Sequence, residues 1–155
     1  KIDILINNAG TLINKSFEET TFKDFQSVYQ VNVFGIAELI RQLLSCFNEK
    51  SHVINISSIG GVGGSSKFPG LSAYSSSKGA LNILTEMLAE EFKDSSISFN
   101  TLALGAVQTE MLKEAFPGYK ANINPFEMAN FIYKFSLEGN SFFNGKTIPV
   151  STTNP

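Results

Sequence analysis

Short apolar runs alternate along this chain with longer segments whose apolar residues recur every three or four positions. Runs of the first kind are typical of strands buried on both faces, and segments of the second kind predict amphipathic helices. The strand-like runs are Ile2–Ile6, His52–Ile56, Ile97–Leu104 and Lys146–Val150, and the helix-like segments are residues 22–47, 73–93 and 126–137. Such alternation requires crossover connections between parallel strands. We therefore predict an α/β fold with a parallel sheet that is covered on both faces.

Two of the predicted helices have recognisable starts. Thr21 is a favourable N-cap residue, and Asp24 three positions later makes a variant capping box with it. Pro125 comes directly before the segment 126–137, and proline is common in the first turn of a helix. These signals support the helical interpretation independently of the apolar periodicity.

Composition narrows the class of protein. The 155 residues are enough for one domain with an apolar core, and 43% of them are hydrophobic. We expect a single domain over residues 1–155. The formal net charge is −2 and the basic residues form no stripe, so we expect no nucleic-acid partner. No apolar run approaches the roughly 20 residues of a membrane span, so we expect no membrane partner.

The single cysteine and the single histidine limit the chemistry. Cys46 has no second cysteine to pair with inside the chain, which fits a reducing, cytoplasmic location. His52 alone cannot build a histidine-based metal site, and it makes a Ser-His-Asp triad improbable. We expect neither residue to have a functional role, and we expect no metal.

Unusual polar residues follow the predicted strands, at the point where each strand ends. In open parallel sheets, ligands bind outside the carboxyl ends of the strands. Residues at that edge are Asn7 and Asn8 after the first strand, Ser57 and Ser58 after the second, Gly105 and Thr109 after the third, and Tyr74 and Lys78 at the start of the helix that follows the second strand. Four separate segments therefore converge on one candidate site.

Tyr74 and Lys78 are four residues apart, which places them on one face of a helix. A free tyrosine has a pKa of about 10, so general acid or base work near neutrality favours a value about three units lower. A lysine charge about 4 Å away stabilises a phenolate by on the order of 4 kcal/mol at an effective dielectric of about 20. That energy corresponds to a pKa shift of about three units. The small residues around them, 75–77 and 79–80, would let the helix approach a neighbouring segment or a partner subunit closely.

Two further features near the site have more than one interpretation. Asn32 lies on the apolar stripe of the segment 22–47, where a buried amide is costly unless it is hydrogen-bonded. It could be tied to nearby backbone, or it could open the helix locally and hold a water near Lys78. The Gly-rich stretch within residues 57–71 has neither P-loop nor G-x-G-x-x-G spacing, which favours a flexible loop beside a pocket.

Taken together, these residues resemble the short-chain dehydrogenase/reductase family. The matching stretches are Asn7–Gly10, Asn32–Gly35, Val53–Ser58, Tyr74–Lys78 and Leu104–Thr109, and they occur in the family's order over nearly the whole chain. The resemblance implies a Rossmann-like doubly wound sheet. It also implies that NAD or NADP is the cofactor for oxidation of a small-molecule alcohol or reduction of a carbonyl. Separately, the bare first strand and the small-residue face around Gly79 lead us to expect a homo-oligomer.

The same resemblance assigns roles to individual residues. Tyr74 would be the acid/base, and Lys78 would lower its pKa and hold the nicotinamide ribose hydroxyls. Ser58 would bind the substrate oxygen, and Asn32 would support a proton relay. The turn formed by Asn7, Asn8, Ala9 and Gly10 would line the adenosine side of the cofactor, while Gly105, Val107 and Thr109 would meet the nicotinamide.

The sequence departs from the family pattern in several places. Leu104 stands where the family has proline, and Ser151–Thr153 replace an Asp-Gly-Gly ending. The stretch between Ser58 and Tyr74 is longer than usual, which leaves Ser57 and Ser58 as alternatives for the substrate contact. The family's Gly-rich pyrophosphate turn is not in the chain. We therefore expect the second half of the fold, with Ile2–Ile6 as an exposed edge strand.

Two other functions fit parts of the pattern. The chain could be an inactive piece of such an enzyme that acts as an oligomeric or binding module, because the pyrophosphate turn is missing. A flavodoxin-like binding domain would explain the alternation of strands and helices, but it gives no reason for Ser58, Tyr74 and Lys78 to occur together.

Overall fold

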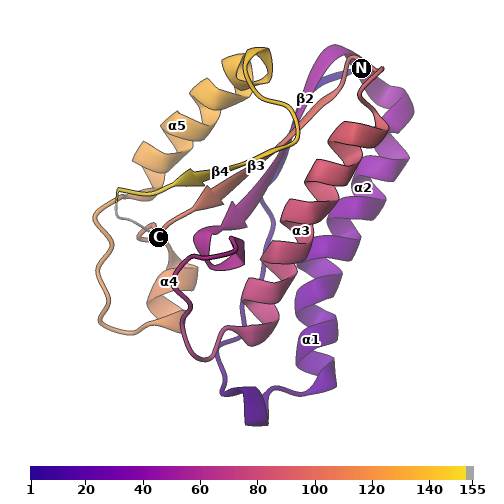
Figure 1. The fold of residues 1–155 in the computed structure, drawn as a ribbon. Helices are drawn as coiled ribbons and strands as arrows, with labels where there is room; N and C mark the ends of the chain where they lie inside the picture. Colours follow the sequence, from indigo (N-terminus) through magenta and orange to yellow (C-terminus); the bar gives the residue numbers. More distant parts are fainter. Residues whose placement is uncertain (153–155) are drawn as a thin grey trace.

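The computed structural model describes residues 1–152 and contains a parallel four-stranded sheet in the order β1-β2-β3-β4. The strands are β1 (Ile2–Asn7), β2 (Phe47–Ser58), β3 (Ser98–Leu104) and β4 (Lys146–Val150), and the α-helices are α1 (Phe22–Tyr29), α2 (Ile36–Leu43), α3 (Ser72–Glu91), α4 (Glu110–Ala115) and α5 (Pro125–Glu138). Figure 1 shows α3 and α2 on one side of the sheet and α5 on the other. The predicted α/β class, the parallel sheet and its two-sided cover are confirmed.

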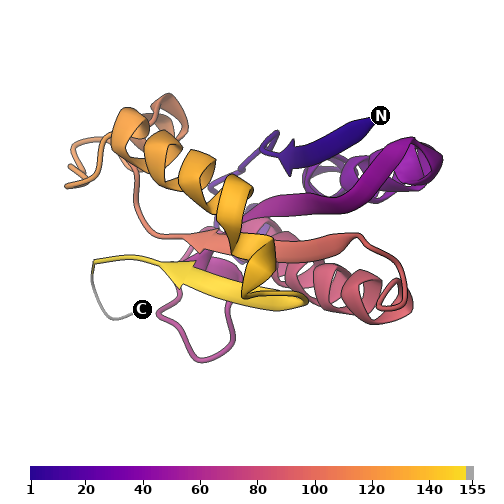
Figure 2. The same cartoon turned by 90° about the horizontal axis from the view of Figure 1, so that it is seen from above.

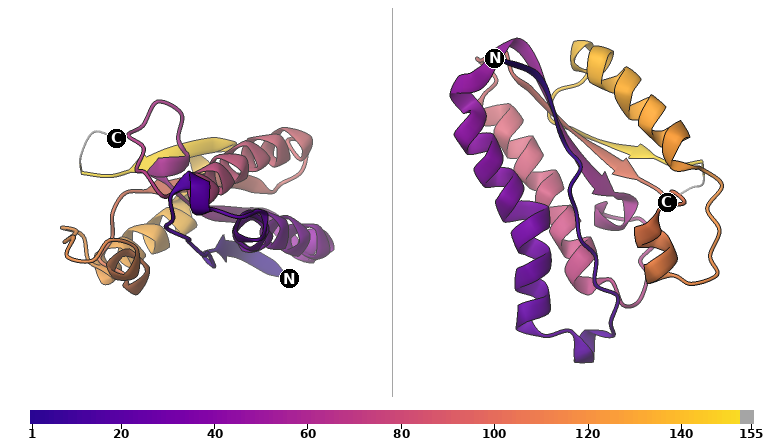
Figure 3. Two further views of the ribbon diagram at one scale, coloured as in Figure 1. Left: turned by 90° about the horizontal axis from the view of Figure 1, so that it is seen from below. Right: turned by 180° about the vertical axis from the view of Figure 1, so that it is seen from behind.

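The core is divided between the two faces of the sheet because neighbouring strand residues point to opposite sides. Val53 of β2 and Phe99 of β3 are fully buried against α2 and α3, in a cluster with Ile40 and Leu81. The next residue of β2, Ile54, faces the other way and packs with Leu102 beneath α5. Figure 3 shows α1 and α2 running alongside α3, while α5 crosses the opposite face. This two-sided burial explains the nearly continuous apolar runs of the central strands.

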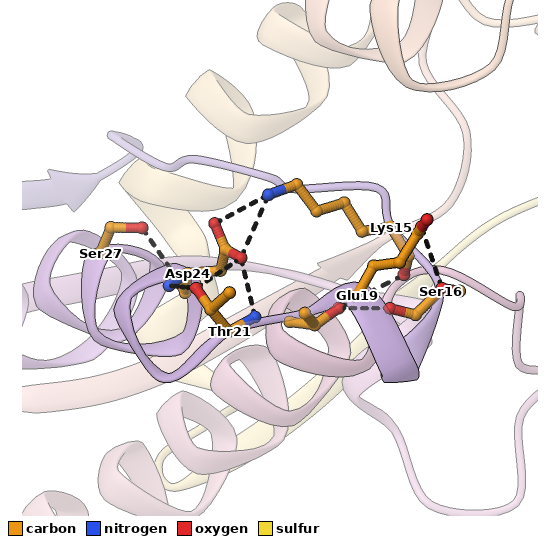
Figure 4. Close-up of polar contacts among 7 residues, drawn as sticks. Lys15, Ser16, Glu19, Thr21, Asp24 and Ser27 are labelled. Carbon is orange, nitrogen blue, oxygen red and sulfur yellow. Dashed lines mark hydrogen bonds and ion pairs between the residues drawn. The ribbon is translucent and has the colours of Figure 1, made fainter.

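The predicted start of α1 is confirmed as a capping box. The backbone N–H of Asp24 donates to the Thr21 hydroxyl at 3.2 Å, and the Thr21 N–H donates to the Asp24 carboxylate at 2.8 Å. Lys15 binds the same carboxylate at 3.1 Å, as Figure 4 shows. The hydrogen bonds from Thr21 and Lys15 lower the pKa of Asp24. The start of α5 is a second capping box, with Asn124 as N-cap and Pro125 in the first turn.

The long helix predicted over 22–47 is not continuous. A π-helical turn, Gln30–Gly35, separates α1 from α2, and the helical segment ends in a 3₁₀ turn before Phe47, which begins β2. Phe47 is buried in the core, which is why the apolar spacing predicted it as the last helical residue. The six-residue α4 was not predicted, because so short a segment shows no apolar period.

One edge of the sheet is formed by β1, which pairs with β2. Figure 2 shows the indigo β1 and the yellow β4 at opposite edges of the sheet. Only Asn7 of the β1 residues is buried, and Ile6 is 39% exposed, so the expectation of an exposed edge strand is confirmed. Thr153 of the unusual C-terminal stretch lies outside the described residues. No helix within residues 1–152 combines the length and the apolar character needed to cross a membrane.

Candidate active site

A cleft of about 340 Å³ opens at the carboxyl ends of the strands, where the sequence placed the site. Figure 1 shows α4 lying beyond the arrowheads of β2 and β3. The predicted site residues that line it are Asn8, Gly10, Ser58, Tyr74, Lys78, Gly105, Val107 and Thr109. The structure therefore brings together residues from the β1 turn, the end of β2, the start of α3 and the end of β3.

Lys78 lies at the bottom of this cleft, with only 4% of its surface exposed. Its Nζ donates a hydrogen bond to the carbonyl oxygen of Ile56 at 2.8 Å and lies 5.8 Å from the centre of the Tyr74 ring. Burial disfavours the charged ammonium and lowers the pKa of Lys78 to about 8. The side chain is therefore still mostly protonated at neutral pH, and it supplies a positive charge beside the tyrosine.

Tyr74 occupies the first turn of α3 and faces the cleft. Burial raises its pKa, and a hydrogen bond with the Ser58 side chain lowers it in part. The net direction is opposite to the one expected from the sequence. Burial costs the phenolate more than that hydrogen bond returns. The phenol hydroxyl therefore holds its proton at neutral pH, as a proton donor must.

The structure distinguishes between the two serines that end β2. Ser57 is buried, and its hydroxyl donates to the backbone carbonyl of Lys78 at 3.2 Å. Ser58 is partly exposed in the cleft, and its hydroxyl accepts from the Gly60 N–H at 3.2 Å and bonds with Tyr74. Ser57 thus holds the strand against α3, while Ser58 is available to a ligand together with Tyr74.

Asn32 lies behind the cleft and does not line it. It is fully buried in the π-helical turn, where Oδ1 accepts from the Thr11 N–H at 2.9 Å. Its Nδ2 donates to the Thr11 carbonyl at 2.9 Å and to the Ser77 hydroxyl at 3.0 Å. Both sequence-based interpretations hold in part: the amide is tied to backbone, and the helix opens at this position. A water held between Asn32 and Lys78 stays a prediction.

Two members of the predicted cofactor turn do not reach the cleft. Asn7 is buried inside the sheet, and its Nδ2 donates to Asn55 Oδ1 at 2.8 Å. Asn55 Nδ2 donates in turn to the hydroxyl of Thr85 on α3 at 2.8 Å. Asn7 therefore joins β1 to β2 rather than facing a ligand, and Ala9 is not among the residues that line the cleft. Sequence reasoning missed this network, although an asparagine inside an apolar strand is a signal for a buried hydrogen bond.

The small residues of α3 accommodate the loop that follows β2. A Cβ atom placed on Gly61 would lie 2.7 Å from the backbone nitrogen of Gly79, so no side chain fits there. Asn82 Nδ2 donates to the Gly61 carbonyl at 3.1 Å and fixes the contact. The neighbour that α3 approaches closely is thus its own preceding loop. This packing holds Ser58 beside Tyr74.

The opposite wall is built from the end of β3 and from α4. The Gly105 N–H bonds to the Val150 carbonyl at 2.9 Å, and a Cβ atom on Gly105 would meet the Ser151 hydroxyl at 2.9 Å. Thr109 caps α4 by accepting from the Leu112 N–H at 3.2 Å. The apolar face of α4, which the sequence analysis missed, lines the cleft with Met111, Leu112 and Ala115.

Comparison with known proteins agrees with this geometry. The family model described as short chain dehydrogenase matches residues 1–120, which is more than half of the chain. The chain belongs to the short-chain dehydrogenase family.

Among relatives of this chain, a fatty acyl-CoA reductase from Acinetobacter baylyi is 34% identical over 136 residues, covering 84% of this chain and 45% of the relative. A rhamnolipids biosynthesis 3-oxoacyl-[acyl-carrier-protein] reductase from Pseudomonas aeruginosa is 30% identical over 168 residues, covering 97% of this chain and 65% of the relative. The chain thus spans less than two thirds of the length of either relative.

Solved structures of short-chain dehydrogenases superpose on nearly the whole chain. One from Salmonella enterica serovar Typhi gives a TM-score of 0.86 at 25% identity and covers 96% of this chain, with 62% of its own length matched. A 4-hydroxyisoleucine dehydrogenase complexed with NADH gives a TM-score of 0.82 at 25% identity, with 96% and 66% covered. The Rossmann-like fold of the family is therefore partially present in this chain.

Proposed function

We propose that the protein containing this chain interconverts a carbonyl compound and the corresponding alcohol, with NAD or NADP as the hydride carrier. The observation that carries the proposal is the meeting of Ser58, Tyr74 and Lys78 in one cleft at the carboxyl edge of the sheet. Two hydroxyl groups there can hold a substrate oxygen, and one of them retains a transferable proton beside a buried cation. A solved relative bound to NADH supports the cofactor class.

The residues of the cleft fit the nicotinamide side of such a cofactor. Gly10 carries no side chain, and a Cβ atom there would stand 3.5 Å from both Lys78 Nζ and the buried Asn32 Oδ1, so a ligand can approach the ammonium over this glycine. Lys78 Nζ donates to Ile56, and an ammonium has further donors for ribose hydroxyls. We assign Gly105, Val107 and Thr109 to the nicotinamide and Asn8 to the adenosine side. When bound, the cofactor supplies the hydride that the carbonyl carbon accepts.

In the reducing direction, Ser58 and Tyr74 donate hydrogen bonds to the carbonyl oxygen. As negative charge develops on that oxygen, Tyr74 transfers its proton to it, and the products are an alcohol and a tyrosinate. The nearby Lys78 ammonium stabilises the tyrosinate in the partly desolvated cleft. The raised pKa makes Tyr74 a weak acid, so its proton moves only as negative charge develops on the substrate oxygen during hydride transfer.

Tyr74 must then regain its proton. Lys78 Nζ and Asn32 Oδ1 border the same space beside Gly10, and Asn32 also contacts Thr11. We propose that the proton returns through Lys78 and a water molecule held beside Gly10, with Asn32 as the positioning residue. The oxidation of an alcohol uses the same groups in reverse order.

The test is an absorbance assay of the complete protein at the reduced-nicotinamide band, with a panel of ketones, aldehydes and secondary alcohols. Turnover with NADH or NADPH is expected for at least one member of the panel. Absence of turnover with every compound and both cofactors, from protein that is folded by circular dichroism, would contradict the proposed activity.

A further inference from the structure

Beyond its polar groups, the cleft has an apolar wall of its own. The side chains that form this wall are Leu12, Met111, Leu112, Ala115 and Phe116. The charged residues of α4, which are Glu110, Lys113 and Glu114, do not line the cleft, because the helix turns its apolar face inward. Among the described residues that line it, the only charged side chain is Lys78, which the proposed reaction already uses.

The outer end of the wall is closed by two phenylalanines from separate segments. Phe116, at the end of α4, meets Phe68 of the long loop edge to face, with ring centres 6.1 Å apart. Phe116 lines the cleft, whereas Phe68 is 59% exposed and packs on the outer side of Phe116. The long loop, which departs in length from the family pattern, therefore limits how far a ligand can extend along α4.

Hydrogen bonds hold these two segments to the chain that follows β1. Asn14 Nδ2 donates to the Ala115 carbonyl at 2.7 Å, and the Lys15 N–H donates to the Gly70 carbonyl at 3.0 Å. Gly70 has a φ of +88°, and a Cβ atom there would overlap the Asn14 side chain. The wall is thus fixed at both ends before a ligand enters, which favours a ligand that matches its shape.

From this arrangement we infer that the substrate is an uncharged carbonyl compound with an apolar chain that lies along Leu112 and ends at the Phe68–Phe116 pair. The inference rests on the proposed function, since Ser58 and Tyr74 mark where the carbonyl oxygen sits. A carboxylate or phosphate on that chain would lose its hydration against an apolar wall that offers no cation. Each methylene group buried there should strengthen binding about three- to fourfold.

The experiment measures binding separately from turnover. Dissociation constants are determined by ligand-observed NMR for methyl ketones of increasing length, from butanone to octanone, with and without NADH. Levulinate, which carries a carboxylate on a ketone of similar size to pentanone, is the charged comparison. We expect affinity to rise about three- to fourfold for each methylene until the cleft is filled, and levulinate to bind at least about tenfold more weakly than pentanone.

Variants of the apolar wall test whether it causes the preference for longer, uncharged ketones. In the wild type, affinity should stop increasing beyond a certain ketone chain length. Phe116→Ala should make this limiting length greater, and Phe116→Leu should largely restore the wild-type limit. Phe126→Ala is the matched control, because Phe126 lies on α5 and is 88% exposed. Thermal unfolding of each variant separates a changed wall from a misfolded protein.

The outcomes distinguish this inference from the proposed function. Length-dependent ketone binding that Phe116→Ala alters, without turnover, would support the apolar site and contradict the reductase activity. Turnover of levulinate as good as that of pentanone would support the activity and overturn the apolar substrate class. Failure of every ketone to bind, with and without NADH, would also overturn it.

Discussion

Asn32 Nδ2 donates to the hydroxyl of Ser77 at 3.0 Å, one residue before Lys78. This contact joins the π-helical turn to α3, and it fixes the backbone from which the buried lysine extends. The Ser77 hydroxyl donates onward to the Tyr74 carbonyl at 2.7 Å. Asn32 and Tyr74 are therefore connected through Ser77 by short hydrogen bonds, and Lys78 follows Ser77 directly in the chain.

Replacing Asn32 should affect stability as well as activity. Asn32→Ala leaves the partly buried N–H and carbonyl of Thr11 without their Asn32 partners, so the free energy of unfolding should fall by about 1–3 kcal/mol. Urea unfolding measures this change. Asn122→Ala, on an exposed residue, is the matched control and should leave stability nearly unchanged. Equal stability of the two variants would mean that the Thr11 contacts contribute little.

Tyr74→Phe removes the transferable proton and keeps the ring. We expect kcat to fall by about 10²- to 10⁴-fold, as for loss of a general acid, with the melting temperature nearly unchanged. Tyr133→Phe serves as the control, because Tyr133 is 61% exposed on α5. Retention of most of the activity by Tyr74→Phe would show that another group supplies the proton.

The buried Lys78 should make stability depend on pH in the alkaline range. Its pKa is about 8 in the folded protein and 10.5 ordinarily, so the unfolded chain binds more protons between these values. The free energy of unfolding contributed by Lys78 should therefore rise from pH 8 to pH 10. Above the ordinary Tyr74 value of 10, the raised pKa of that tyrosine acts in the opposite sense and lowers stability.

Urea unfolding of the wild type and of Lys78→Met across this range measures the effect. The wild type should gain stability relative to the variant as the pH rises from 8 to 10. Parallel profiles for the two proteins would show that the lysine is not desolvated in the folded state.

Cofactor affinity should differ between this chain and the complete protein. Pyrophosphate binding in such folds depends on backbone N–H groups at a helix N-terminus after a Gly-rich turn. The sequence of 155 residues contains no turn of that spacing. We therefore expect the chain alone to bind NADH and NADPH weakly and not to turn over. Titration calorimetry measures both affinities, and tight binding by the chain alone would reveal a phosphate site elsewhere in it.

The edge formed by β1 should promote self-association of the chain. Its backbone groups on the side away from β2 are free to pair with another strand, and Ile6 is partly exposed. Light scattering should therefore detect oligomers of the chain. Ile6→Lys places a charge on this edge and should shift the population toward monomer. A monomeric wild-type chain at the same concentration would contradict this expectation.

The sequence predicted those parts of the fold and of the candidate site that depend on a single local pattern. The central strands could be predicted because both faces of residues 52–56 are buried, and Tyr74 and Lys78 could be placed together because the helical repeat fixes their spacing. The rim of the parallel sheet then brought Ser58 and Gly105 to the same cleft. Each of these inferences uses only local geometry and the direction of the strands.

Other features depend on contacts that no local pattern encodes. The pKa direction of Tyr74 was wrong because spacing gives the distance to a charge but not the degree of burial. Asn7 was assigned to the cofactor, yet its partner Asn55 lies on another strand. The π-helical turn was expected only as one of two interpretations of Asn32, because an apolar period does not mark such an interruption. The helix α4 was missed because it is too short to show an apolar period.

The contact between Gly61 and Gly79 divides the long loop into parts that tolerate change differently. No methyl group fits where Gly61 meets α3, whereas a Cβ atom on Gly63 would meet nothing within 4 Å. Insertions and substitutions can therefore accumulate at the tip of the loop, where they reshape the mouth of the cleft, while Ser58 keeps its place beside Tyr74. A single methyl group added at Gly61 would therefore disturb the placement of Ser58, whereas the same change at Gly63 would leave it untouched.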